Sequence, residues 1–187
     1  MPQSQTSHSV MGLPAARERV LAWLESGSPR STIPRHRRAA LAGQALMRGA
    51  ELAGIVKRRF ATCDPEAIAQ KLGVSVSQTH ASPAFEAMAA LAAYHRRTPR
   101  IVLFGNVIQA CREELIRAGR EHAAFRLRDI CVAHELCHHL ERGREHGPAA
   151  MREIAAHAFA ASLLDLDFLP CALEPFAAAG LRRKATA

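Results

Sequence analysis

The chain has 187 residues, of which 25 are basic and 17 acidic, and its formal net charge is +8. Apolar residues make up 49% and aromatic residues 5%, which predicts one globular domain, or one domain with an extension, and argues against an all-β sandwich. No apolar run reaches the roughly 18 residues that a membrane helix needs, and the N-terminus lacks the basic flank and apolar core of a secretion signal. We therefore expect a cytoplasmic protein with no membrane partner.

The cysteines are also typical of a cytoplasmic protein. Their number is odd and no pair has C-x-x-C spacing, so reduced thiols are expected rather than a disulfide framework. We expect all of them to be small, packed side chains: Cys63, Cys111, Cys131, Cys137 and Cys171.

The N-terminal quarter predicts a helical extension. Residues 14–25 place apolar side chains on one face of a short helix, which ends at the Gly-Ser-Pro of residues 27–29. A second helix is expected over about residues 34–59. We place a helical, partly disordered extension at residues 1–44 and the main domain at residues 45–187.

Three arginines, Arg35, Arg37 and Arg38, lie in the first turns of that second helix. Positive charge there opposes the helix dipole unless an anion or a partner binds it. A binding face for nucleic acid or an acidic protein is therefore one interpretation of the basic charge. The other interpretation is that the arginines simply lie on solvated helix faces.

The main domain predicts helices and short strands. Asp64-Pro65-Glu66 combines an N-cap, a proline and an acid at the start of a helix that we expect to end at Gly73. Residues 84–95 fit either a helix or a strand that pairs with the strand expected at 101–104. The remaining expected elements are a strand at 74–76 and helices at about 105–118, 124–141, 149–164 and 171–179.

The most informative string runs from Ala133 to His139 and contains H-E-x-x-H within an expected helix. Four-residue spacing puts His134 and His138 on one face, one turn apart, where two imidazoles can hold one zinc ion. Glu135 lies next to them and can take a proton from the water that the ion activates. The residue types and their spacing thus match metal-assisted hydrolysis.

The same string can occur by chance, because the chain has 10 histidines. Its context favours a metal site, since an apolar stripe away from the two histidines would pack into the core and leave them facing a cleft. The stripe comprises Val132, Ala133, Leu136 and Leu140.

A catalytic zinc site usually has three protein ligands and one open position. Glu153, fifteen residues after His138 on the next expected helix, is our first choice for the third ligand. The alternative for Glu153 is an exposed acid in a first helical turn, favoured by the helix dipole. Alanines on its helix would let the two helices approach closely: Ala155, Ala156, Ala158, Ala160 and Ala161.

His146 is the rival third ligand. Metzincins show H-E-x-x-H-x-x-G-x-x-H, and here Gly143 and His146 come two residues later than that pattern requires. His157 lies four residues after Glu153 on the same helix face. We expect it to line the cleft or to hydrogen-bond a ligand or the substrate.

Two strings in this region resemble the ImmA/IrrE metallopeptidases. The first is A-H-E-L-x-H, within residues 128–140. The second is F-A-x-x-L-L, within residues 156–164, and in the family an acidic ligand lies six residues before it. Glu153 lies six residues before Phe159, so the resemblance gives Glu153 the role of third ligand.

The resemblance covers roughly residues 45–170 and implies a zincin-like α+β domain, predominantly helical, with a small β-sheet. It also implies a cytoplasmic zinc peptidase. Members of the family cleave a helix-turn-helix repressor, often in stress responses. Cys137 and His157 depart from the family, which often has glycine at the first position and asparagine or a similar residue at the second.

We expect a regulatory zinc endopeptidase that hydrolyses a peptide bond in a protein substrate, with a DNA-binding helix-turn-helix repressor as the first candidate. His134, His138 and Glu153 would hold one Zn²⁺ per chain, and Glu135 would act as general base. Tyr94, the only tyrosine, is a candidate for stabilising the oxyanion. The alternative is a noncatalytic, zinc-braced module that binds nucleic acid or an acidic protein.

Overall fold

The structure is a computed structural model that describes residues 13–25, 33–80, 90–143 and 147–186. Helices occupy both ends of the described chain, and three short strands lie between them. The α+β, mostly helical class is therefore confirmed. The elements are α1 Leu13–Glu25, α2 Arg35–Phe60, α3 Pro65–Lys71, β1 Ser75–Thr79, β2 Ala92–His95, β3 Arg100–Phe104, α4 Gly105–Arg117, α5 Glu121–Leu140, α6 Ala149–Leu163, the 3₁₀ helix η1 Pro170–Leu173, and α7 Glu174–Ala185.

The three strands form one mixed sheet in the order β1-β3-β2. β1 runs parallel to β3 with Val76 opposite Ile101, and β2 runs antiparallel to β3 with Tyr94 opposite Ile101. Ile101 of the central strand is fully buried, and β2 and β3 pack on α5. Residues 92–95 of the ambiguous segment thus form a strand, while residues 84–89 lie outside the described chain.

The turn before α3 explains where that helix starts. The Asp64 carboxylate accepts hydrogen bonds from the backbone N–H of Glu66 at 2.9 Å and of Ala67 at 3.2 Å. Pro65 occupies the first turn, where a helix needs no N–H. Gly73 follows the helix with φ of 69°, a conformation that glycine adopts without strain. The expected start and end of this helix are confirmed.

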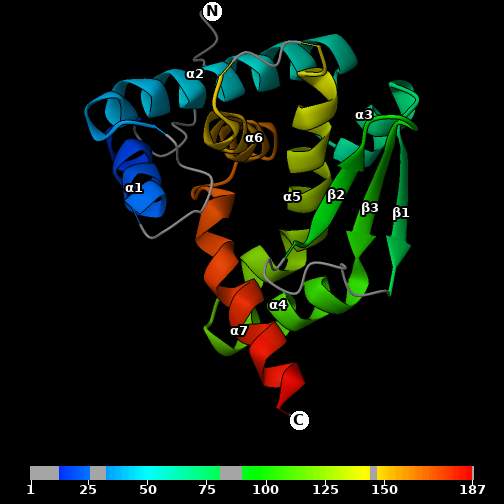
Figure 1. Cartoon of the computed structure of the whole chain (residues 1–187). Helices are drawn as coiled ribbons and strands as arrows, with labels where there is room; N and C mark the ends of the chain where they lie inside the picture. The colour runs from blue at the N-terminus through cyan, green and yellow to red at the C-terminus, as the bar shows by residue number, and fades with distance from the viewer. Residues whose placement is uncertain (1–12, 26–32, 81–89, 144–146, 187) are drawn as a thin grey trace, which may run out of the picture.

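α6 packs against both α2 and α5 and is buried along most of its length. Figure 1 shows it end-on beneath α2, with α5 beside it. α2 crosses it closely at Gly49, where an added Cβ would come within 2.8 Å of the Ala158 Cβ and 2.9 Å of the Phe159 nitrogen. The alanines expected to permit close approach are all buried, and two of them, Ala155 and Ala158, lie at the close crossing with α2.

The N-terminal helices share the core of the rest of the molecule. Val20 and Leu24 of α1 are buried, and they belong to the same cluster of apolar side chains as those of α5 and α6. α2 is one continuous helix, so it runs through the expected boundary between residues 44 and 45. The secondary structure therefore has no break at that point. Residues 1–12 of the expected extension lie outside the described chain.

Two details differ from the sequence expectations. The helix expected at 171–179 is a 3₁₀ turn followed by α7, which continues to Ala185. Cys63, expected to be packed, is exposed because it lies in the short link between α2 and α3, whereas the other four cysteines are buried. Within the described ranges, no helix is both long enough and apolar enough to cross a membrane.

Candidate metal site

Helices α5 and α6 bring the three expected ligands together. On α5, Nε2 of His134 lies 3.3 Å from Nε2 of His138, one turn further along. On α6, Oε2 of Glu153 lies 3.2 Å from the first of these nitrogens and 3.8 Å from the second. His134, His138 and Glu153 form a group that could hold a metal ion, which we call the metal group.

The rest of α5 holds the two histidines in place. Val132, Ala133 and Leu136 of the expected apolar stripe are fully buried, so the opposite side of the helix faces α6 and the metal group. Directly after the helix, the buried carboxylate of Glu141 lies 2.7 Å from Nε of Arg48 on α2. Packing along the helix and an ion pair at its end thus fix its position.

The side chains of the metal group shift one another's pKa values. Burial alone would raise the pKa of Glu153, but hydrogen bonds with His134 and His138 hold it well below its usual range. Burial alone would lower the pKa of His134, but the hydrogen bond with Glu153 and the negative charge of Glu135 raise it. Glu153 is therefore ionised near neutral pH, as a carboxylate ligand must be.

Glu135, the expected general base, lies beside the metal group without belonging to it. It is half-buried on α5, directly after His134, and its negative charge acts on that imidazole. A carboxylate next to a metal ligand could exchange a proton with a water molecule bound to an ion that the metal group would hold.

Tyr94 of β2 contacts His139, the residue that follows the second histidine of the metal group. Its hydroxyl and Nδ1 of His139 form a 2.8 Å hydrogen bond, and the two rings pack edge to face with centroids 5.4 Å apart. His139 directly follows His138, so this contact holds β2 against α5 beside the metal group. Burial and the nearby Arg142 lower the pKa of His139, which favours a neutral ring in this bond.

A cluster of Trp23, His157 and Glu174 lies next to His134, and we call it the Trp23 cluster. The His157 ring lies 4.7 Å from the His134 ring and 5.9 Å from the Trp23 ring, between centroids. Its spacing from Glu153 had indicated a place near the site, but the ring is packed inside rather than open to a cleft. Trp23 and Glu174 are 151 residues apart and carry no motif, so no signal in the sequence indicated them.

The structure decides between the two interpretations of Glu153 but does not describe His146, the rival third ligand. Glu153 is the fifth residue of α6 and its side chain is only 25% exposed, so it is not an exposed acid in the first turn. His146 lies in residues 144–146, outside the described chain.

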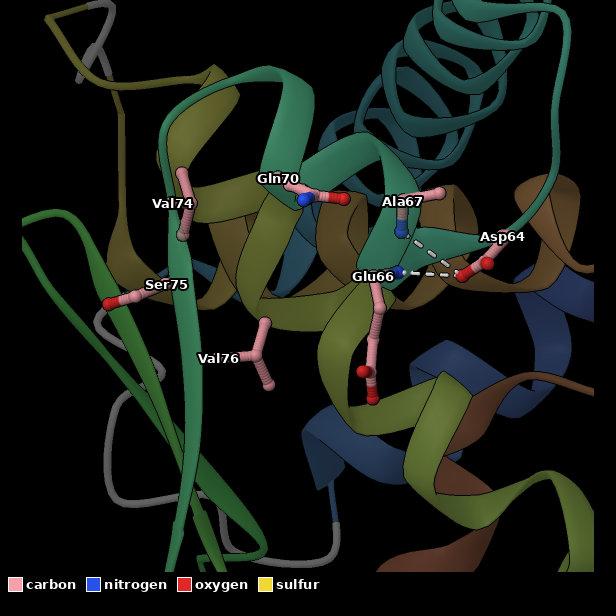
Figure 2. A pocket seen from close by; sticks show the side chains of 7 residues that line it. All are labelled: Asp64, Glu66, Ala67, Gln70, Val74, Ser75 and Val76. Carbon is pink, nitrogen blue, oxygen red and sulfur yellow. Dashed lines mark hydrogen bonds between the residues drawn. The ribbon is translucent and has the colours of Figure 1, made fainter.

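A separate pocket of about 410 Å³ opens between α3 and β1 (Figure 2). None of its lining residues belongs to the metal group. Asp64 caps α3, and Oε1 of Glu66 lies 2.6 Å from Nε of Arg128 on α5. These carboxylates therefore serve to anchor two helices. The pocket is lined by Asp64, Glu66, Ala67, Gln70, Val74, Ser75 and Val76.

The metal group is thus assigned from the positions of its own side chains. A scan of protein-family models, a search of curated proteins and a search of solved structures each found no match to the chain.

Proposed function

We propose that the chain is a zinc-dependent peptidase whose metal is held by His134, His138 and Glu153. The observation that carries the proposal is the convergence of two imidazoles and one carboxylate, from two adjacent helices, with ligand atoms 3.2, 3.3 and 3.8 Å apart. Imidazole nitrogen and carboxylate oxygen are both common ligands of zinc in proteins.

The spacing within the metal group fits a zinc ion. Tetrahedral bonds of about 2.0–2.1 Å place ligand atoms about 3.3 Å apart, close to the separations observed. Three protein ligands leave one position for water or substrate, as in catalytic sites, whereas structural sites are closed by four protein ligands. Within the described ranges, no fourth histidine, cysteine or acidic side chain joins the group.

The chemistry of the site divides between the ion and Glu135. A zinc ion bound here would lower the pKa of a water molecule toward about 7 and polarise the scissile carbonyl. We assign to the Glu135 carboxylate, next to His134 in the chain, the role of accepting the proton of the attacking water and then donating it to the leaving amine. Partial burial strengthens these charge interactions because it keeps bulk water away from them.

Strand β2 offers a place for the substrate backbone. In the described part of the chain β2 pairs with no strand other than β3, and the hydrogen bond between Tyr94 and His139 holds it beside α5. An extended peptide could add to its other edge through backbone hydrogen bonds. We therefore propose a protein substrate cleaved in an extended segment. The resemblance to the ImmA/IrrE metallopeptidases makes a helix-turn-helix repressor the first candidate.

Zinc content and peptide cleavage test the proposal together. Purified without chelators, the parent protein should hold about one zinc per chain and cleave members of a proteome-derived peptide library, read by mass spectrometry. Glu135→Gln should keep the zinc and the fold but lower cleavage by about 10²–10⁴-fold, because proton transfer is lost. Glu121→Gln, an exposed glutamate on the same helix, is the matched control and should cleave like the parent.

Two results would contradict the peptidase. One is a parent that holds no zinc, and the other is a Glu135→Gln variant that cleaves as fast as the parent. A parent that holds zinc but cleaves nothing would favour the noncatalytic, zinc-braced module.

A further inference from the structure

The Trp23 cluster connects helix α1 to the metal group. Nε1 of Trp23 donates a 2.8 Å hydrogen bond to Oε2 of Glu174, the first residue of α7. The other carboxylate oxygen, Oε1, lies 3.7 Å from Nε2 of His157 on α6. The His157 ring in turn packs against the ring of His134. A continuous series of contacts thus runs from α1, through the start of α7, to a metal ligand.

His157 has little freedom to move within this cluster. It is 7% exposed, and the Trp23 ring meets it nearly at right angles, with 83° between the planes. A ring enclosed in this way keeps one orientation, because interiors pack at high density. Since the His134 ring lies against it, the orientation of His157 limits how far that ligand can tilt.

Glu174 adds an electrostatic contribution. Its carboxylate is near enough to His134 for its negative charge to act on that ring. A negative charge near a histidine ligand favours the binding of a cation by that ligand.

We propose that Trp23 and Glu174 are positioning residues of the metal site, which hold His157 against His134 and so couple the docking of α1 to metal binding. This inference rests on the metal binding in the proposed function and is independent of peptidase activity. The coupling is reciprocal: if docked α1 tightens metal binding, bound metal stabilises the docking of α1 by the same factor.

Trp23 is the only tryptophan in the chain, so its fluorescence reports directly on this cluster. Zn²⁺ has a filled d shell, so a change in emission on adding zinc reflects a change around the indole rather than absorption by the ion. Zinc titrated into the metal-free parent should change the emission with the same midpoint as zinc uptake, which competition with a coloured chelator measures. Emission that stays constant while zinc binds would overturn the proposal.

Three variants test the contacts through zinc affinity. Trp23→Phe keeps an aromatic ring but removes the hydrogen-bond donor, and Glu174→Gln keeps the size but removes the charge. Each should weaken zinc binding about tenfold, the effect typical of groups that support a metal ligand. The double variant should bind little more weakly than either single variant, because both act through one series of contacts. Glu113→Gln, a surface glutamate on α4, is the control and should bind zinc like the parent.

The outcomes separate this inference from the peptidase proposal. Parental zinc affinity in both single variants, with folding verified by circular dichroism and thermal melting, would overturn the inference alone, as would fully additive losses in the double variant. A parent that binds zinc but cleaves nothing would overturn the peptidase alone, and one that binds no zinc would overturn both. If Trp23→Phe fails to fold, Glu174→Gln decides, because its side chain is 53% exposed and tolerates change.

Discussion

The metal group and the pocket between α3 and β1 both adjoin α5, and both contain carboxylates. In the metal group, one carboxylate and two imidazoles point at one another within 3.8 Å, with at most 25% of any side chain exposed. The pocket is an open space of about 410 Å³, and its carboxylates are directed at a helix N-terminus and at an arginine. Convergence of metal-ligating side chains, rather than the size of a hollow, therefore distinguishes the candidate site.

The largest expected difference between the two regions is in metal affinity. His138→Ala removes one of three ligands and should weaken zinc binding by more than about 100-fold, beyond what the loss of a supporting group costs. Gln70→Ala, an exposed side chain of the pocket, should leave zinc binding at the parental level. Equilibrium dialysis followed by elemental analysis gives both values. Equal losses in the two variants would remove the distinction between the regions.

Helix packing gives the next effect. Gly49→Ala places a methyl group against the α6 backbone and should lower the free energy of unfolding by about 1–3 kcal/mol, because the close crossing of α2 and α6 must open. Gly43→Ala, on the same helix with nothing within 4 Å, should raise it by about 0.5–1 kcal/mol. Urea unfolding of both variants measures the contrast. A stable Gly49→Ala protein would mean that α6 can shift without cost to the fold.

The smallest effect concerns the pocket. Asp64→Ala removes the N-cap of α3 and should lower the free energy of unfolding by about 1 kcal/mol, with zinc affinity unchanged. Asp64→Asn retains a capping oxygen and should remain close to the parent. Thermal melting measures the stability of the two variants, and zinc titration measures their zinc affinity. A loss of zinc in Asp64→Ala would show that the two regions are coupled through α5.

Much of the site could be predicted from the sequence because its determinants are local. Four-residue spacing on one helix determines how His134 and His138 meet, and alanines on the next helix indicate that Glu153 can come close. Helix caps act over a few residues in the same way, which is why the start at Asp64 was predictable. The identity of β2 was less clear, since an alanine-rich segment becomes a strand only through pairing with β3.

The Trp23 cluster could not be predicted, for a physical reason. Its members come from α1, α6 and α7, and their contact depends on how three helices pack rather than on any spacing in the chain. His157 alone carried a signal, through its position one turn after Glu153. The exposure of Cys63 also depends on the tertiary arrangement, because a link between two helices is covered only if another element lies over it.

The continuity of α2 determines which N-terminal residues a fusion or a recombined protein must include to keep the packing around the metal group. A junction at residue 45 would divide the helix and remove part of the cover that α6 receives. A junction just ahead of Ile33 would keep α2 whole but leave Trp23 behind. An exchangeable unit that keeps the described contacts of the Trp23 cluster to the metal group therefore has to include α1, Leu13–Glu25.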